Sequence, residues 1–156
     1  MSDLAVLLRE IAGDDEWSRH EALERLRREG SGGVPLEQLR DALDDDDDAS
    51  RRSAARMALA ALASPASPDR RAAQEVLGRA VRSDHPDLRV LAASALGEAG
   101  DPGAVGHLVA ALEDGDANVV AAAADALGVL GHPAGIAPGV ALQGGKIAPL
   151  EQINVS

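Results

Sequence analysis

Two stretches of the sequence decide the fold: DLRVLAASALG at residues 87–97 and NVVAAAADALG at residues 118–128. The second stretch repeats the first after a shift of 31 residues. In both, the apolar residues follow the spacing i, i+3, i+4, i+7, i+8, which places them on one face of an α-helix. A helix with one apolar face that recurs along the chain predicts a stack of similar helical units.

Weaker copies of this helix lie upstream, around residues 50–59 and 17–26. When the four copies are aligned, one position holds Arg19, Arg52 and Arg89, and then Val120 in the last copy. A nearby position holds alanine in all four, at Ala22, Ala55, Ala92 and Ala123. Alanine is the best helix former, strand-favouring residues are scarce, and the chain has one aromatic residue, Trp17. We therefore expect closely packed helices.

A proline follows each of these helices, at residues 35, 68, 102 and 133. Proline suits the first turn of a helix, where its missing N–H would have no partner. Ser67 and Asp101 precede two of the prolines as expected N-caps, and Gly100 is an expected left-handed helix end. Each unit is thus predicted to be a helix, a short turn and a second helix.

Residues 87–112 match much of the pattern D-x-x-V-R-x-x-A-A-x-A-L-G-x-x-G-D-P. Asp87 lies two residues before the arginine, and the residues at the spacing of the pattern are Arg89, Ala92, Ala93, Ala95-Leu96-Gly97 and Gly100-Asp101-Pro102. In this it resembles the HEAT repeat family, and in particular the short bacterial repeats also found in phycobilin lyase subunits. The resemblance implies an all-α solenoid of about four HEAT-like repeats, over residues 15–44, 45–83, 84–114 and 115–143. We assign residues 1–143 to this repeat domain. Repeat solenoids serve many unrelated functions, so the resemblance predicts a fold more than an activity.

The repeat pattern fails inside the fourth unit. Pro138, Gly135 and Gly139 fall within the second helix expected there, and an interior proline costs a helix about 3 kcal/mol. We expect this helix to be short, kinked or absent. A solenoid normally needs a polar repeat to cover its last helix. The end of this array is rich in alanine, valine and glycine, so we expect the tail, a second copy or a partner to cover it.

Residues 144–156 are not repeat sequence, and we expect them to form a flexible or docked C-terminal tail. They contain a possible glycine hinge and the only lysine of the chain, followed by several apolar residues. A second interpretation is that this tail is presented to a partner for recognition, processing or modification. The candidate residues are Gly144, Gly145, Lys146, Ile147, Leu150, Ile153 and Val155.

Several classes of function are disfavoured by what the sequence lacks. There is no cysteine, so neither a disulfide framework nor a thiolate metal site can form. No catalytic or phosphate-binding motif is present, and we expect a protein that is not an enzyme and carries no cofactor. The first residues do not form a secretion signal, and no apolar run reaches the roughly 20 residues that span a bilayer. We expect a cytoplasmic protein without a membrane anchor.

The net charge of −11 is unevenly distributed along the chain. Residues 1–48 hold 6 basic against 15 acidic residues, residues 49–82 hold 7 against 2, and residues 83–156 hold 2 against 9. Such an acidic chain repels nucleic acid in general. The basic middle segment either balances its acidic neighbours or forms a surface that binds an acidic partner. The candidate partner-binding residues are Arg51, Arg52, Arg70, Arg71 and Gln74. Because second helices usually line the concave surface of HEAT-like arrays, the resemblance favours Arg70, Arg71 and Gln74, which lie early in an expected second helix.

Two other groups of residues favour structural interpretations. The run Asp44 to Asp48 is expected to form a solvated loop that caps the following helix, and it lacks the ligand spacing of a calcium loop. The four histidines, His20, His85, His107 and His132, show no spacing typical of a metal site. We therefore expect no bound metal.

These observations favour a non-catalytic adaptor or scaffold that binds another protein or a peptide through its solenoid surface. A homodimer formed through the uncapped C-terminal end is a further possibility. Two alternatives stay open: a carrier or precursor protein whose tail after Gly144-Gly145 is recognised, processed or modified, and a subunit of a lyase-type enzyme.

Overall fold

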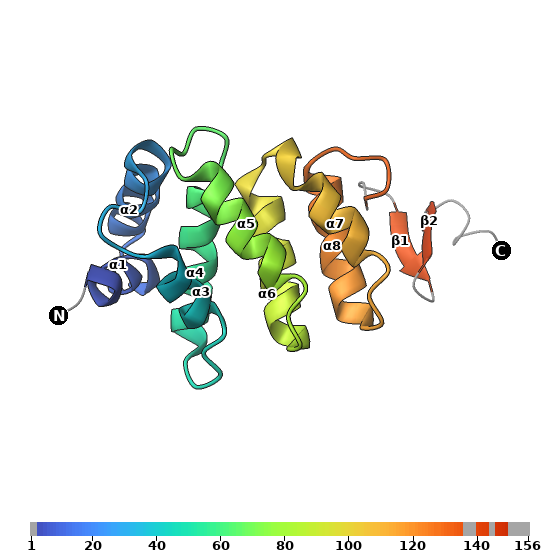
Figure 1. Cartoon of the computed structure of the whole chain (residues 1–156), viewed down its shortest axis with the longest axis horizontal. Helices are drawn as coiled ribbons and strands as arrows, with labels where there is room; N and C mark the ends of the chain where they lie inside the picture. Colours follow the sequence, from blue (N-terminus) through green and yellow to red (C-terminus); the bar gives the residue numbers. More distant parts are fainter. Residues whose placement is uncertain (1–2, 136–139, 144–145, 150–156) are drawn as a thin grey trace.

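The computed structural model describes residues 3–135, 140–143 and 146–149, and Figure 1 shows the helices stacked in sequence order. The described part contains eight α-helices, a short 3-10 helix η1 (Pro102–Ala104) and a β-hairpin. The α-helices are α1 (Asp3–Ala12), α2 (Glu16–Glu29), α3 (Leu36–Leu43), α4 (Ala49–Leu62), α5 (Arg70–Ala80), α6 (Pro86–Ala99), α7 (Val105–Ala111) and α8 (Ala117–Val129). This arrangement confirms the predicted α-solenoid.

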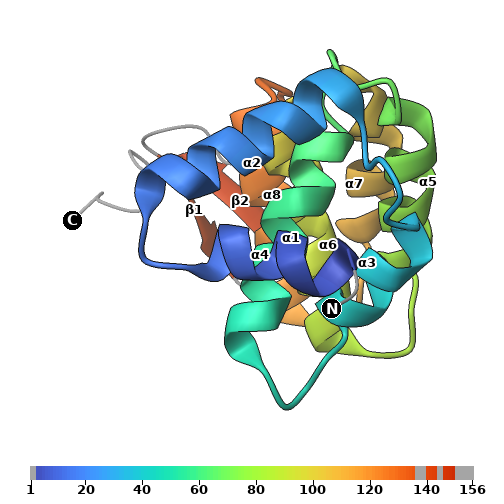
Figure 2. The same ribbon diagram turned by 90° about the vertical axis from the view of Figure 1, so that its left-hand side faces the viewer.

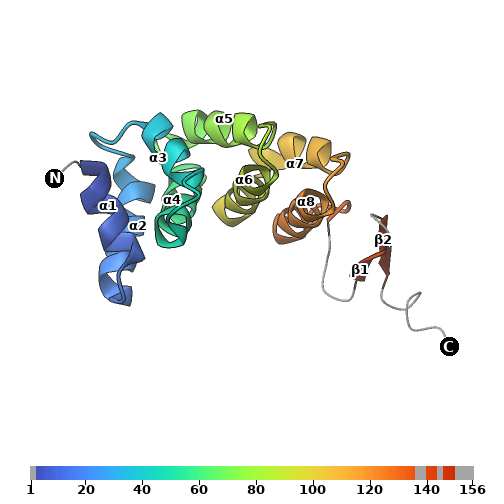
Figure 3. The ribbon, with the colours of Figure 1, turned by 90° about the horizontal axis from the view of Figure 1, so that it is seen from below.

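The helices form two layers of a shallow arch (Figure 3). The first helices of the repeats, α2, α4, α6 and α8, form the inner layer, and α3, α5 and α7 form the outer layer. The inner helices pack on one another more extensively than the outer helices do, which makes the inner side the shorter one. The expectation that the second helices line the concave surface is therefore wrong for this chain.

Small residues explain why the inner helices approach so closely. The aligned alanines Ala22, Ala55, Ala92 and Ala123 all have no exposed surface. At Gly97 the approach is closer still, since a Cβ atom there would lie 2.6 Å from the Cβ of Ala126 on α8. With so little side-chain volume between them, α6 and α8 pack almost backbone to backbone, and the array bends toward this layer.

Helix α1 lies outside the predicted repeats and closes the N-terminal end of the array. It packs against α2 and α4, and Figure 2 shows it in front of α4 when the array is viewed from this end. Leu7, Leu8 and Ile11 are buried and place one apolar face on the core. The spacing of these apolar residues was the sequence signal for a helix, but the segment does not carry the repeat pattern.

The helix ends follow the predicted capping chemistry at several positions. Asp48 ends the aspartate run and accepts a hydrogen bond from the backbone N–H of Arg51, so it caps α4 as expected. Asp101 accepts from the N–H of Gly103 and caps η1, and Gly100 has the left-handed backbone expected of a helix end. The prediction for Ser67 is wrong, because the N-cap of α5 is Asp69, and Ser67 instead accepts from the N–H of Asp69 in the turn before the helix.

The fourth repeat has no regular second helix in the part that the structure describes. Residues 133–135 form a turn, in which a Cβ on Gly135 would lie 2.1 Å from the backbone nitrogen of Gly128. This turn therefore folds back onto the end of α8. Beyond it, β1 (Val140–Gln143) pairs antiparallel with β2 (Lys146–Pro149), and Gln143 lies opposite Lys146. The sequence predicted no strand here, because residues 133–143 were interpreted as a broken helix.

Candidate binding surface

The aligned arginines are structural residues. Each donates to a backbone carbonyl in the segment that precedes its own helix: Arg19 to Ile11 and Gly13, Arg52 to Asp45, and Arg89 to Ser83, at 2.6–2.9 Å. These carbonyls lie in or near the ends of the preceding helices, where no intrahelical donor is available. The arginine position of the repeat pattern therefore joins each first helix to the turn before it.

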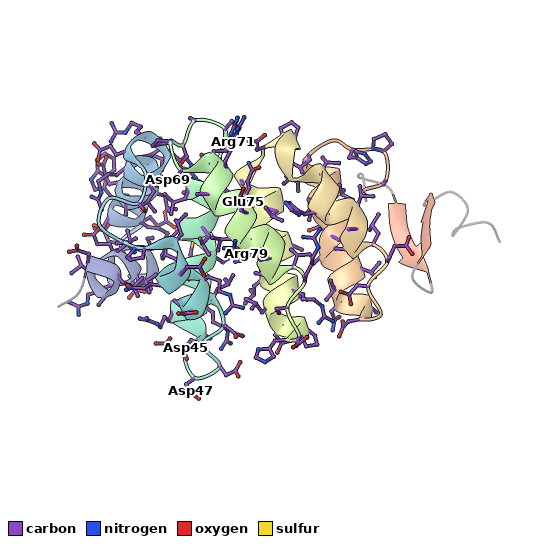
Figure 4. All side chains as sticks on the ribbon, in the orientation of Figure 1. Asp45, Asp47, Asp69, Arg71, Glu75 and Arg79 are labelled. Carbon is purple, nitrogen blue, oxygen red and sulfur yellow. The ribbon has the colours of Figure 1, made fainter. Side chains whose placement is uncertain are left out.

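The basic middle segment does not form one surface. α4 and α5 run in opposite directions, so Arg51 and Arg52 lie at one edge of the array and Arg70 and Arg71 at the other. Figure 4 shows this separation, with Arg71 at the upper edge and Asp45 at the lower edge. The five candidate partner-binding residues are thus not brought together. Arg51 and Arg52 lie at the start of α4 and Arg70 and Arg71 at the start of α5, and the starts of two antiparallel helices lie at opposite edges of the array.

Gln74 is buried and committed to contacts within the fold. The residue is only 9% exposed. Its Nε2 donates to the carbonyl of Ala63 at 3.1 Å and to Oδ2 of Asp101 at 2.8 Å. Arg70 approaches the same carboxylate, with its Nε 3.4 Å from Oδ2. The backbone N–H of Gly103, and then Gln74 and Arg70, hold the pKa of Asp101 below its usual value. These contacts join α5 to the turn before α7, and they leave Gln74 unable to contact a partner.

Most of the remaining arginines are also paired. Arg51 lies beside Asp45, Arg56 beside Glu98 and Arg79 beside Glu37, while Arg82 donates to the carbonyl of Gly78. Burial lowers the pKa of Arg56.

Arg71 is exposed and has no acidic partner among the described residues. On α5 it alternates with Glu75 and Arg79, which Figure 4 shows along the same helix. The outer layer therefore mixes both charges instead of presenting a basic surface.

The inner layer offers a more regular surface. α6 has α4 and α8 at its sides and α5 and α7 on its outer side, so its partly exposed residues face the inside of the arch. The same positions are partly exposed on α8 after the repeat shift of 31 residues. We define the inner face as these ten residues: Asp87, Val90, Leu91, Ser94 and Glu98 of α6, and Asn118, Ala121, Ala122, Asp125 and Val129 of α8.

A groove of about 540 Å³ opens at one end of the inner face, beside the first turn of α6. Its walls come from the α3–α4 loop and from the starts of α4, α6 and α8. At its wall, Oδ2 of Asp44 lies 3.2 Å from Nδ1 of His85, a residue outside the groove, and Arg52 is held by the carbonyl of Asp45. The residues that line the groove are Leu43, Asp44, Asp46, Arg52, Asp87, Leu88, Val90, Leu91 and Asn118.

Trp17 is the only aromatic residue of the chain and is 71% exposed. It is the second residue of α2, next to the α1–α2 turn. This turn projects on the side of the arch away from the outer helices (Figure 3). In the repeat alignment Trp17 takes the position of Ser50, Asp87 and Asn118, two residues before the aligned arginine. The alignment groups Trp17 with Asp87 and Asn118 of the inner face, but neither the inner layer nor the exposure of Trp17 could be predicted from the sequence.

The tail candidates are only partly described. Lys146 and Ile147 belong to β2, whereas Gly144, Gly145, Leu150, Ile153 and Val155 lie outside the described residues. Near the tail, Val129 at the end of α8 is 67% exposed, while Val120 and Ala124 on the same helix are buried. An apolar side chain thus stays exposed at the C-terminal end of α8, whereas apolar side chains earlier in the helix are buried.

Two features are absent from the described part of the chain. Within residues 3–135 and the two strands, no group of three or more His, Asp or Glu side chains could hold a metal ion. Over the same residues, none of the helices is long and apolar enough to cross a membrane.

Comparison with known proteins agrees with the geometry. Residues 73–138 match the family model for HEAT repeats, a span that runs from α5 through α8 and the turn after it. No curated protein matches the chain. The match supports the HEAT-repeat assignment for the part of the array that is most regular in sequence.

Proposed function

We propose that this HEAT-like solenoid is a non-catalytic, cytoplasmic adaptor that binds another protein through the inner face. HEAT repeats commonly mediate interactions between proteins, which supports this class of function. The observation that carries the choice of surface is the regularity of the inner face. The same positions of α6 and α8 are left partly exposed, while the helices around them are packed together.

The composition of the inner face suits a protein partner. Val90, Leu91 and Ala122 pack against the core but keep part of their surface accessible, so a partner can bury apolar area there without any rearrangement. Trp17 adds an exposed aromatic side chain at the repeat position that Asp87 and Asn118 of the inner face occupy. Tryptophan is enriched among the residues that dominate binding energy at interfaces.

The outer layer is a weaker candidate. Its arginines are paired or alternate with acids, and Gln74 is buried. The described residues provide no observation that favours the tail-processing or lyase-subunit alternatives, and the resemblance to phycobilin lyase subunits stays a prediction from the repeat pattern.

The experiment compares two matched variants of the full chain. Val90→Glu places a charge on the inner face, and Val109→Glu places the same charge on α7 of the outer layer, where Val109 is 40% exposed. Proteins recovered with each variant from the native host are identified and quantified. We expect partners of the wild type to be lost with Val90→Glu and kept with Val109→Glu.

Loss of the partners with Val109→Glu alone, or with neither variant, would contradict the proposal. Because Val90 also packs against the core, Trp17→Ala serves as a second inner-side variant that removes an exposed side chain. Circular dichroism of each variant checks that the array is folded.

A further inference from the structure

The groove beside the first turn of α6 combines an apolar floor with carboxylates that lack a basic partner. We propose that it binds a basic amphipathic segment of a partner protein, in which lysine or arginine side chains flank an apolar one. This inference rests on the proposed function and deepens it, since the groove is the end of the inner face. It names the chemistry of the partner that the inner face recognises.

The floor of the groove is apolar and remains accessible. Leu88 is only 1% exposed and forms part of the core beneath it, while Val90 and Leu91 keep partial exposure above. An apolar side chain placed there would bury these surfaces and release the water that covers them. A simple cation would make no use of this floor, and the described residues contain no cluster suited to a metal ion.

Two carboxylates of the groove are available to a partner. Asp46, in the α3–α4 loop, and Asp87, in the first turn of α6, are exposed and have no basic side chain as a partner in the described part of the chain. Their neighbours differ, because Asp45 is paired with Arg51 and Asp44 lies beside His85. Asp46 and Asp87 are therefore the unpaired acids of the groove, and they can pair with a partner without breaking an existing contact.

The charge of the whole chain favours the same partner. With a net charge of −11, the protein repels acidic segments and attracts basic ones within the Debye screening length of the solution. Arg52 lies in the groove but is held by the carbonyl of Asp45, so it orders the wall and does not neutralise Asp46 by a direct pair. Charge complementarity thus selects a basic segment, and the apolar floor selects an amphipathic one.

The test uses two short fluorescein-labelled synthetic peptides with the full chain. One has leucine and lysine at helical amphipathic spacing, and the other has glutamate in place of each lysine. Binding is followed by fluorescence anisotropy. We expect the lysine peptide to bind and the glutamate peptide not to bind. Equal binding of the two peptides, or binding of neither, would overturn the proposal.

A matched pair of variants separates the groove from general electrostatics. Asp46→Asn/Asp87→Asn removes the two unpaired acids of the groove. Asp47→Asn/Asp84→Asn removes two exposed acids of neighbouring loops that do not line the groove. Both change the net charge by the same amount. We expect about a tenfold loss of affinity for the lysine peptide with the first pair, and less than about a twofold loss with the second. Equal losses would show that the groove has no specific role.

The outcome for the inference is distinct from the outcome for the proposed function. If partners from the host are lost with Val90→Glu but recovered normally with Asp46→Asn/Asp87→Asn, the inner face binds a partner and the basic-segment inference is wrong. If Val90→Glu and Trp17→Ala both leave partner recovery unchanged, the proposed function fails whatever the peptides do.

Discussion

The guanidinium of Arg89 is paired with the carboxylate of Asp114 through two contacts. Its Nε lies 2.9 Å from Oδ2, and its Nη2 donates to Oδ1 at 3.1 Å. The two side chains are only 16% and 14% exposed. Because Arg89 lies in the first turn of α6 and Asp114 follows α7, the pair holds the two helices of the third repeat together at one edge of the array. The arginine of the repeat pattern is thus part of the packing of the third repeat.

We predict that Asp114→Asn lowers the free energy of unfolding by about 1–3 kcal/mol. The substitution removes a paired charge and leaves Arg89 partly buried without its carboxylate. The adjacent Glu113→Gln is a suitable control, since Glu113 is exposed and should change stability by less than about 0.5 kcal/mol. Urea denaturation of both variants measures the difference. Equal stabilities would mean that the pair contributes little.

A second prediction concerns the close approach of α6 and α8. In Gly97→Ala the new Cβ would lie 2.6 Å from the Cβ of Ala126 and 2.8 Å from its Cα, so the helices must separate. We expect a loss of about 1–3 kcal/mol. Gly106→Ala on α7 is the matched control, because a Cβ there meets nothing within 4 Å. It should stabilise the chain by about 0.4–1 kcal/mol, since alanine restricts the unfolded state. Thermal unfolding of the two variants distinguishes these opposite signs.

The stability of the array should also depend on the protonation of His107. Its ring packs on α5 at Gly78, and its Nδ1 lies 3.2 Å from Nη1 of Arg82. Burial, and then the charge of Arg82, lower the pKa of His107 in the folded chain. The unfolded chain therefore takes up this proton first as the pH falls below about 6.5, and folding stability decreases until the folded pKa is passed. We predict that His107→Asn removes this part of the pH dependence, measured by urea denaturation between about pH 7 and pH 5. An unchanged slope would contradict the assignment.

Trp17 provides a direct optical measurement. As the only tryptophan, and 71% exposed, it should show a red-shifted emission and efficient quenching by iodide in the free protein. Trp17→Ala should change the free energy of unfolding by less than about 0.5 kcal/mol, because an exposed side chain contributes little to packing. Blue-shifted emission without a partner, or a large loss of stability, would show that Trp17 is covered in solution.

The sequence predicted the repeated helices well because each one carries its own periodic apolar face and its own capping residues. Asp48, Gly100 and Asp101 perform the predicted local roles, since a cap depends only on the few residues next to it. Helix α1 was missed because it does not share the repeat pattern. The hairpin was not predicted because Val140 and its neighbours were interpreted as the end of a second helix that Pro138 interrupts.

The candidate site was predicted less well, for a geometric reason. Arg51, Arg52, Arg70, Arg71 and Gln74 are near one another in sequence, but the antiparallel packing of α4 and α5 separates them into two edges. The same packing buries Gln74 against Asp101. The inner layer could not be identified from the pattern either, because curvature depends on how closely residues such as Gly97 and Ala126 approach across the array.

The central claim, that partners bind on the inner side of the arch, can be measured by site-specific photo-crosslinking in the native host. A photoreactive phenylalanine analogue is placed at Trp17 on the inner side or at Arg71 on the outer layer, both of which are exposed. The account predicts that irradiation joins the protein to another protein at position 17 and not at position 71. Adducts that form at position 71 and not at position 17 would contradict it.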